Sequence, residues 1–422
     1  MMINYQEYVE SDIRWIGNIP AHWGLSKIGR HFKLERGRVI SNVEIANNVG
    51  KYPVYSSQTK NNGQLGSINT YDFDGEYVSW TTDGANAGTC FYRKGKFNVT
   101  NVCGLISSFD IEIDYKFLSF FLNLGTKNFV RKDINPKLMN DMLSEIPVLI
   151  LPIKEQKLIS QYLDKKTQQI DSLIKKIEKK IELIQEQKNA LITQYVTKGL
   201  DPNIEMKHSG VDWIGEIPKH WKVGKLYQYS RLTSGSTPSK DKQEYWGNGI
   251  IPWMTSGEIN KKFIRSIDLK ISKKGFENCT LEILPVGTVM IGLNGQGKTK
   301  GTAGILKTET TCNQSLCGII PNESLNSTFL YYFLESQYKH LRGLVGEGKR
   351  EGISVSFLSR YPVLIPPQNE QKEIKKNLTL KLDNLEKISF LSQTKVERLK
   401  EYRQSLITSV VTGKIRITED MI

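Results

Sequence analysis

The chain has 422 residues, 39% of them hydrophobic, and a formal net charge of +14. This length is more than one compact core usually holds and predicts two or three domains. The positive charge favours a polyanionic partner, because lysines and arginines that neutralise phosphates release condensed counterions. The longest apolar run, residues 146–153, is too short to span a bilayer. The N-terminus lacks the order of basic and then apolar residues that is typical of a signal peptide. We therefore expect a cytoplasmic protein with no membrane partner.

The five cysteines and five histidines do not form a metal-binding pattern. The cysteine number is odd, no C-x-x-C pair occurs, and the histidines form no H-E-x-x-H cluster. Unpaired, mostly buried thiols in a reducing compartment are the simplest interpretation. We predict no metal site.

The chain is a tandem duplication, and its first repeated motif lies near the N-terminus. DIRWIGNIPAHW at residues 12–23 returns as GVDWIGEIPKHW at residues 210–221, and IPVLILPIKEQKLI at 146–159 returns as YPVLIPPQNEQKEI at 361–374. The segments between these motifs have diverged, and the second is longer. This pattern is typical of a scaffold repeated for structural reasons that carries two different inserts. The tryptophans of the first motif are predicted to pack in both copies, with a docking surface for a partner as the alternative.

The first diverged lobe, residues 13–150, is predicted to mix α and β structure. Short β-type runs such as GEYVSW and FNVTNVCGLISSF alternate with loops rich in Gly, Asn, Ser and Thr, and an apolar helix, YKFLSFFLNL, follows. Polar side chains around these loops can donate to phosphates or pair with base edges. The candidates for DNA contacts in this lobe are Thr81, Thr82, Asn86, Arg93 and Lys94.

A long helix is predicted from Glu155 to about Lys198. Apolar residues recur at alternating spacings of four and three, as in the seam of a coiled coil, with Lys188 as an interruption. Pro152 precedes the helix, and Gly199 with Pro202 ends it.

The second lobe, residues 211–365, contains a literal phosphate-loop pattern, GLNGQGKT at residues 292–299. A phosphate loop needs a helix N-terminus after the glycine-rich turn, whereas here two further glycines follow at 301 and 304. The corresponding segment of the first lobe, WTTDGANAGTCF, keeps the glycines and lacks the G-K-T. We interpret both as loops that read DNA. The candidates in this lobe are Asn294, Gln296, Lys298, Thr299 and Lys300, with Lys349 and Arg350 in a second basic loop. For each candidate in both lobes, an ordinary solvated surface group is the alternative.

A second long helix is predicted from Asn369 to about Thr412, with Leu385, Ile388, Val396, Leu399, Leu406 and Val410 apolar. Two amphipathic helices of this kind are expected to bury their stripes on each other as a coiled coil. Connectivity makes the pair antiparallel, so the expected molecule is a closed dumbbell with pseudo-twofold symmetry. Two independent helical linkers, or a coil between molecules, are the alternatives.

The duplicated W-I-G-x-I-P-x-H-W and P-x-x-E-Q motifs, each P-x-x-E-Q followed by a long helix, resemble the specificity subunits (HsdS) of type I restriction-modification enzymes. The resemblance covers essentially the whole chain. It implies an α+β protein with a first target-recognition domain at residues 1–150, a conserved helix at 151–200, a second such domain at 201–366 and a conserved helix at 367–422.

The resemblance also implies function and partners. The family recognises a bipartite, asymmetric site on double-stranded DNA that is methylated on adenine. It binds two methyltransferase subunits (HsdM) and, in the full enzyme, two restriction subunits (HsdR). Since no N-P-P-Y-type methyltransferase motif occurs in this sequence, we expect no catalysis by the chain itself. S-adenosylmethionine, ATP and Mg²⁺ are expected on the partner subunits. The competing interpretations are a P-loop ATPase using Lys298 and Thr299, and a coiled-coil adaptor that does not read DNA.

Overall fold

The structure, a computed structural model, describes residues 4–132, 135–295, 298–343 and 352–422. The chain divides into two compact units. Unit 1 comprises Met1–Glu178 and Gln393–Ile422, and unit 2 comprises Lys179–Ser392. Each unit therefore combines one lobe with parts of both long helices, which differs from the four consecutive segments that the sequence suggests.

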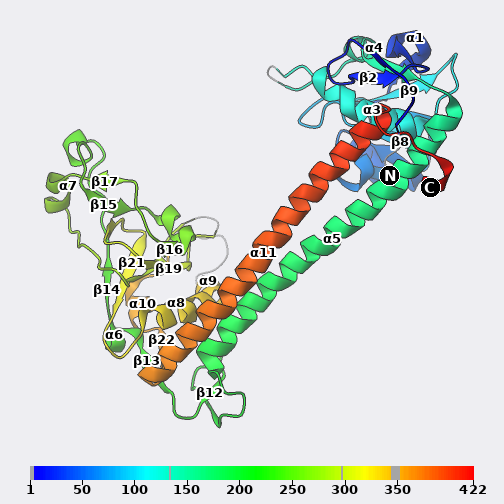
Figure 1. The fold of residues 1–422 in the computed structure, drawn as a ribbon. Coiled ribbons are helices and arrows are strands. Elements are labelled where there is room, and N and C mark those ends of the chain that lie inside the picture. The colour runs from blue at the N-terminus through cyan, green and yellow to red at the C-terminus, as the bar shows by residue number, and fades with distance from the viewer. Residues whose placement is uncertain (1–3, 133–134, 296–297, 344–351) are drawn as a thin grey trace. The chain divides into compact units, whose positions relative to one another are not determined.

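Unit 1 is built on a six-stranded sheet with strand order β4-β9-β7-β8-β5-β6, in which only the β5–β8 pair is parallel. Helix α3 (Tyr115–Gly125) packs on β7 and β8. Two smaller pairs, β1–β2 and β3–β10, complete the unit (Figure 1). The strands are β1 (Tyr8–Glu10), β2 (Asn18–Pro20), β3 (Gly24–Lys27), β4 (Phe32–Arg36), β5 (Val49–Tyr55), β6 (Gln64–Ile68), β7 (Phe73–Thr81), β8 (Cys90–Val99), β9 (Cys103–Ser108) and β10 (Pro147–Ile150). The short helices are α1 (Ile28–His31), α2 (Asn42–Asn47) and α4 (Asn140–Ser144).

Unit 2 has a five-stranded sheet with strand order β14-β21-β18-β19-β16 and a separate three-stranded sheet, β17-β15-β20. Pairs β11–β12 and β13–β22 repeat the two small pairs of unit 1. The strands are β11 (Met206–His208), β12 (Glu216–Pro218), β13 (Lys222–Lys225), β14 (Ser230–Ser234), β15 (Ile251–Met254), β16 (Phe263–Ile264), β17 (Lys270–Ile271), β18 (Val289–Gly292), β19 (Ala303–Leu306), β20 (Thr311–Cys312), β21 (Leu316–Pro321) and β22 (Pro362–Ile365). The shorter helices are α6 (Leu226–Tyr229), α7 (Lys273–Glu277), α8 (Ser327–Ser336), α9 (Tyr338–Gly343) and α10 (Val355–Ser359).

The two units share a four-stranded core with the same connectivity, which confirms the duplication in three dimensions. Strands β4-β9-β7-β8 of unit 1 correspond to β14-β21-β18-β19 of unit 2. The register agrees as well, because Trp80 faces Gly104 in the β7–β9 ladder and Met290 faces Gly318 in the β18–β21 ladder. The three-stranded sheet is the main addition in unit 2 and accounts for the greater length of the second lobe.

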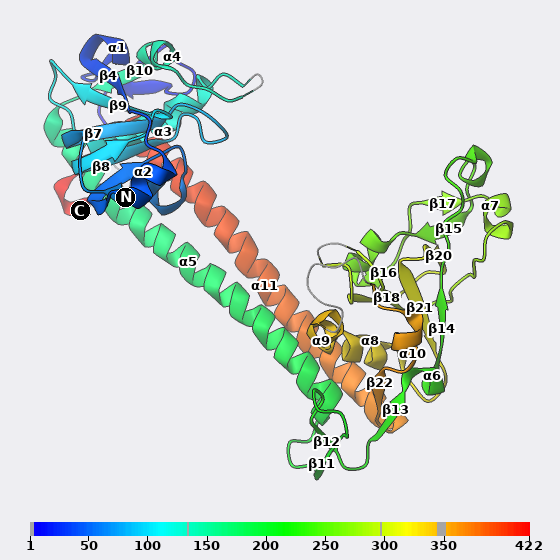
Figure 2. The ribbon, with the colours of Figure 1, turned by 180° about the vertical axis from the view of Figure 1, so that it is seen from behind.

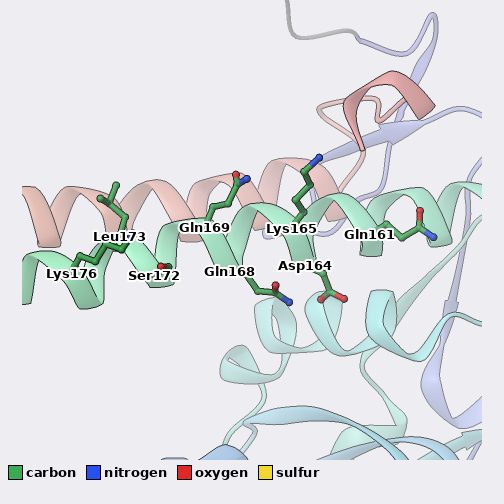
Figure 3. Close-up of a pocket in the computed structure, with 8 residues that line it drawn as sticks. All are labelled: Gln161, Asp164, Lys165, Gln168, Gln169, Ser172, Leu173 and Lys176. Atoms are coloured by element: carbon green, nitrogen blue, oxygen red, sulfur yellow. The ribbon is translucent and has the colours of Figure 1, made fainter.

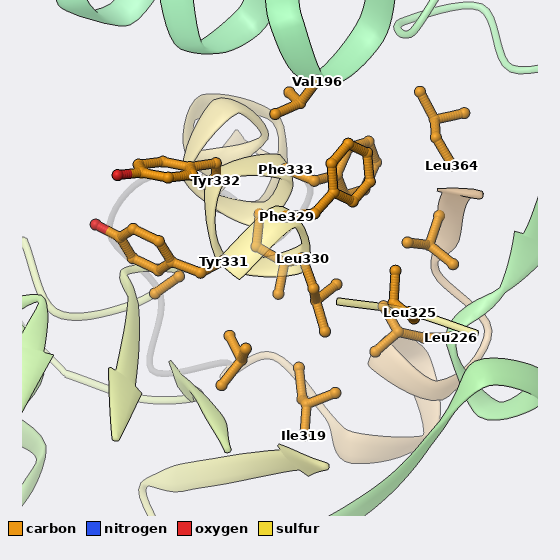
Figure 4. Close-up of a cluster of buried hydrophobic side chains, with 14 of the residues drawn as sticks. Val196, Leu226, Ile319, Leu325, Phe329, Leu330, Tyr331, Tyr332, Phe333 and Leu364 are labelled. Carbon is orange, nitrogen blue, oxygen red and sulfur yellow. The ribbon is translucent and has the colours of Figure 1, made fainter. Parts of the chain in front are cut away.

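The core of unit 2 lies around helix α8. Phe329, Leu330 and Phe333 of this helix are fully buried, and strand residues such as Ile319 lie beneath them (Figure 4). Val196, from the last turns of the first long helix, contributes to the same cluster. The helix forms where the sequence predicts it, because Asn326 caps its N-terminus by accepting from the backbone N–H groups of Thr328 and Phe329.

The two predicted long helices are confirmed as α5 (Ile153–Lys198) and α11 (Gln368–Val411). They lie side by side and antiparallel within each unit (Figure 2). In unit 1, Arg403 pairs with Asp171 at 2.8 Å and Lys400 pairs with Glu178 at 3.4 Å. In unit 2, Lys188 pairs with Glu386 at 2.8 Å, and Lys381 donates to the Tyr195 hydroxyl.

The predicted seam is correct along α5 and partly wrong along α11. Ile170, Ile174, Ile177 and Ile184 of α5 are all less than 10% exposed. On α11, however, Ile388 is 40% exposed, because the four-three spacing that starts at Leu385 continues through Ser389 and Ser392 instead. Serines therefore occupy the seam positions between Leu385 and Val396, and Ile388 lies outside the seam.

Each long helix begins with a carboxylate that ties it to the tryptophan-containing motif of its own unit. Glu155 accepts from Tyr5 Oη at 2.8 Å and Trp23 Nε1 at 3.1 Å, and its other oxygen lies 2.8 Å from His22 Nε2. Glu370 likewise accepts from Trp221 Nε1 at 3.0 Å. Trp23 and Trp221 are buried, as predicted, whereas Trp213 is 47% exposed and stacks on His340.

The ends of the helices also repeat. Gly199 after α5 and Gly413 after α11 both have a left-handed backbone, with φ of 76° and 73°, which favours glycine. In unit 1 the carbonyl of Gly413 accepts from Tyr8 Oη at 3.1 Å, so the C-terminal segment packs on the N-terminal one. Among the residues that the structure describes, no helix is long and apolar enough to cross a membrane.

Candidate nucleic-acid interface

The predicted contact loop of unit 1, residues 82–89, connects β7 to β8 at one end of the sheet. Thr81 and Thr82 are buried, at 1% and 0% exposure. The Thr82 hydroxyl accepts from Arg36 Nη1 at 2.9 Å and donates to Asp83 Oδ2 at 2.7 Å. The hydroxyl of Thr81 donates to the carbonyl of Asn86. Both threonines therefore shape the loop from inside, and the expectation that they are accessible donors is wrong for this structure.

Arg93 requires the clearest correction among the candidates. Its side chain lies inside the lobe, 2% exposed, with the guanidinium carbon 3.5 Å from the centre of the Tyr55 ring. Nε donates to Ser79 Oγ and Nη1 to the carbonyl of Asn62, both at 2.8 Å. Burial lowers the pKa of Arg93 to about 10, so the group is still a cation at neutral pH. A guanidinium enclosed in this way is a supporting group and not a surface donor.

Asn86 and Lys94 lie nearer the surface. Asn86 is half-buried, and its side-chain amide donates to the carbonyl of Ser57 at 3.3 Å. Lys94 is exposed and forms an ion pair with Glu76 at 2.9 Å. Their contact with DNA stays a prediction.

The glycine-rich loop of unit 2 is the turn of a β-hairpin. It leaves β18 and enters β19, and the two strands are antiparallel, with Ile291 facing Ala303. A phosphate loop holds its anion at the N-terminus of a helix, and a strand occupies that place here. Lys298 and Thr299 therefore lack the geometry of a P-loop, as the two additional glycines indicate.

The remaining candidates of unit 2 divide by exposure. Asn294 and Lys298 are exposed, Thr299 is half-buried, and Lys300 is only 8% exposed, so the expectation of an accessible ammonium is wrong for Lys300. Gln296, Lys349 and Arg350 lie outside the described residues. Lys298 also lines a groove of 1260 Å³ within unit 2, together with Lys198, Tyr338 and Lys339.

Sequence reasoning missed a second polar loop in unit 1, residues 57–62, which follows β5. Thr59, Lys60, Asn61 and Asn62 are exposed. The signal was present as the run SSQTKNNG at residues 56–63, which is rich in polar and turn-forming residues. In the described part of the chain, no cluster of three or more His, Cys, Asp or Glu residues could hold a metal ion.

Two related lobes, each with its own polar loops at the end of a common four-stranded core, define a protein that presents two different recognition surfaces. The family model for the type I restriction modification DNA specificity domain matches residues 20–183 and again residues 218–401. The chain therefore belongs to the type I restriction-modification DNA specificity family, whose members recognise DNA and do not carry the catalytic sites.

Individual relatives agree with this assignment. A putative type I specificity subunit of Mycoplasma pneumoniae is 33% identical over 81% of this chain and 84% of its own length. The N-terminal part of another from the same organism is 50% identical over 31% of this chain and 71% of its own length. A solved chain from a study of type I restriction-modification complex assembly has the same fold, with a TM-score of 0.71 and 12% identity over 93% of this chain and 98% of that chain.

Proposed function

We propose that this specificity subunit reads a bipartite, asymmetric site on double-stranded DNA, one half with each lobe, and directs adenine methylation and DNA cleavage there. The observation that carries the proposal is the shared core of the two units. Strands β4-β9-β7-β8 and β14-β21-β18-β19 have the same connectivity, while the loops at their ends differ in length and sequence. A common scaffold with different polar loops is what two unlike half-sites require.

The partners in this proposal are two methyltransferase subunits (HsdM) and, in the complete enzyme, two restriction subunits (HsdR). S-adenosylmethionine, ATP and Mg²⁺ belong to those partners, and the complex acts in the cytoplasm. The net charge of +14 supports DNA as the ligand, since phosphate contacts supply affinity that is independent of sequence.

Exchange of residues 13–150 for the first lobe of another specificity subunit tests whether each lobe reads one half of the DNA site. Methylated adenines are mapped in host DNA without the gene, with the wild-type gene and with the exchanged gene. One half of the recognised sequence is expected to change and the other to stay the same. The reciprocal exchange of residues 211–365 is the matched control, and it should alter the opposite half.

Three results would contradict the proposal. A change in both halves after a single exchange would refute the modular assignment. Absence of sequence-selective DNA retention in the presence of the methyltransferase subunit would favour a protein-binding adaptor. Micromolar binding of a labelled ATP analogue by the isolated chain, abolished by Lys298→Ala, would favour an ATPase.

The outer faces of the long helices support the methyltransferase as a docking partner. In unit 2, Leu380, Ile388 and Leu391 lie along one stripe of α11 and are 57%, 40% and 57% exposed. In unit 1 a shallow depression follows α5, where Gln169 and Leu173 project from the same side of the helix (Figure 3). Exposed leucines at helical spacing suit an amphipathic helix of a partner protein.

Replacing Leu380 and Leu391 together by lysine is expected to weaken binding of the methyltransferase subunit by about tenfold or more for each leucine. The estimate follows from ~1.5–3 kcal/mol for the burial of each side chain. Titration calorimetry with the purified partner measures the change. Val286→Lys, at an apolar position of the lobe that is 58% exposed, is the control. Unchanged affinity of the double variant would show that the partner binds elsewhere.

A further inference from the structure

Arg93 is a buried cation without a counter-charge. Among the residues that the structure describes, no carboxylate forms an ion pair with it, and its partners are the Ser79 hydroxyl, the Asn62 carbonyl and aromatic rings. Enclosing an unpaired charge costs stability, and a neutral apolar side chain of similar size would avoid that cost. The stacking on Tyr55 and the two directed hydrogen bonds offset part of this cost. The hydrogen bond from Arg93 Nη1 to the carbonyl of Asn62 links the side chain to a residue outside the strands of the sheet.

That bond reaches a segment with an unusual backbone. Asn61, Asn62 and Gly63 have φ angles of 50°, 52° and 81°, three successive residues in the left-handed region. Asparagine adopts this conformation more readily than most residues, yet it is uncommon outside glycine. The loop is closed by a bond of 2.9 Å from the Ser56 N–H to the carbonyl of Gly63. Arg93 therefore holds one particular conformation of the 57–62 loop.

The side chains of this loop differ in their contacts, and Gln58 Nε2 donates to the carbonyl of Gln64. Thr59, Lys60, Asn61 and Asn62 are exposed, and within the described residues their side chains make no hydrogen bond or ion pair. Amides can pair with the edge of adenine through two hydrogen bonds, and an ammonium can bind a phosphate or the edge of guanine. The loop thus offers base-reading groups on a fixed backbone, which keeps the entropy lost on binding small.

The loop is continuous with the contact loop at residues 82–89. Asn86 Nδ2 donates to the carbonyl of Ser57 at 3.3 Å, so the two loops form one polar surface. Unit 2 does not repeat the arrangement. Trp80 pairs with Cys90 in unit 1, and the equivalent Met290 pairs with Gly304 in unit 2. Counting three residues further along each strand places Lys307 at the position of Arg93. Lys307, however, is exposed. The arrangement is therefore particular to the first lobe.

We propose that the 57–62 loop is a base-reading element of the first lobe, with the amides of Asn61 and Asn62 on base edges and Arg93 as the residue that positions them. The proposal rests on the function proposed above and names the part of the first lobe that performs it. Arg93 does not touch DNA in this assignment. Its effect is transmitted through the carbonyl of Asn62.

The test uses Asn61→Gly and Asn62→Gly in the full-length chain, bound to its methyltransferase subunits. Glycine accepts the left-handed backbone without strain, so these changes remove the amides and keep the loop conformation. Discrimination between the cognate base and the other three is expected to fall about tenfold at one or two positions of one half-site. The other half-site should be read as before. Methylation rates on a library of single-base target variants provide the measurement.

Asp12→Gly is the matched control, because Asp12 is also exposed, has a φ of 57° and lies in a different connection of unit 1, between β1 and β2. It should leave base preference unchanged. Arg93→Lys keeps the charge and loses the pair of directed donors. We expect it to lower discrimination in the same half-site, whereas a purely structural role would weaken binding to all sequences equally.

Two outcomes would overturn the inference. In the first, the Asn61→Gly and Asn62→Gly variants read both half-sites as the wild type does. In the second, Arg93→Lys lowers affinity uniformly with an unchanged base preference. Failure of the proposed function looks different, because the wild-type complex itself would then show no sequence preference.

Discussion

Replacing Gly104 by alanine is expected to destabilise unit 1 by about 3 kcal/mol. Gly104 lies in β9 opposite Trp80, and a Cβ atom there would overlap the six-membered part of the Trp80 ring. The ring has no room to move, because it is fully buried and its Nε1 donates to the carbonyl of Leu138 at 3.0 Å. The new methyl group must therefore displace backbone or break that bond.

The duplication provides an internal control for this prediction. Gly318 occupies the same position in unit 2, and a Cβ atom there would approach two methyl groups of Leu284 at 3.1 Å. A leucine side chain can adjust by a few tenths of an ångström, so Gly318→Ala is expected to cost less than about 1 kcal/mol. Thermal unfolding measures both variants, and hydrogen exchange resolved by peptide assigns the loss to a unit. Equal losses for the two glycines would contradict the argument.

Removing the Glu155 carboxylate is expected to cost about 3 kcal/mol and to loosen the N-terminal segment from α5. Glu155→Ala deletes the acceptor of both Tyr5 and Trp23, and Trp23 is only 4% exposed. The indole N–H would be left buried without a partner, which is the expensive part of the change. The carboxylate also lies in the first turn of α5, where the helix dipole favours negative charge.

Faster hydrogen exchange over residues 4–23 measures this effect. Glu178→Ala is the control on the same helix, since Glu178 pairs with Lys400 at the surface and its loss should cost less than about 1 kcal/mol. Glu370→Ala should have a similar effect on residues 206–221 of unit 2. The effect should be somewhat smaller because, in the part of the chain that the structure describes, His220 and Trp221 contact Glu370 and no tyrosine does. Unchanged exchange in Glu155→Ala would mean that packing alone holds the segment.

The long helices, the shared sheets and the class of function could be predicted from sequence because each depends on a regular pattern. Seam positions repeat every three or four residues, and duplicated motifs identify equivalent elements without any coordinates. Ile388 shows the limit of this reasoning. Its hydrophobicity suggested a seam position, but the helical phase set by Leu385 and Val396 places serines there.

The residues that contact DNA were harder to predict, because the type of a residue does not show whether its side chain is buried or exposed. Arg93 and Thr82 both have the right chemistry for DNA and are both buried. Arg93 lies inside the lobe because alternate residues of β8 face the core, whereas Thr82 is enclosed by its hydrogen bonds to Arg36 and Asp83 in the loop after β7. The 57–62 loop was missed for the opposite reason. Nothing in its sequence shows that a distant arginine fixes its backbone, and that contact exists only after β5 and β8 have paired.

The division of the chain into units has a consequence for synthesis on the ribosome. Unit 2 is a continuous stretch, Lys179–Ser392, whereas unit 1 needs both Met1–Glu178 and Gln393–Ile422. Because translation proceeds from the N-terminus, residues 1–178 emerge early and cannot complete unit 1 until residues 393–422 have been made. A premature stop codon before Gln393 would therefore damage the part of the protein that is made first.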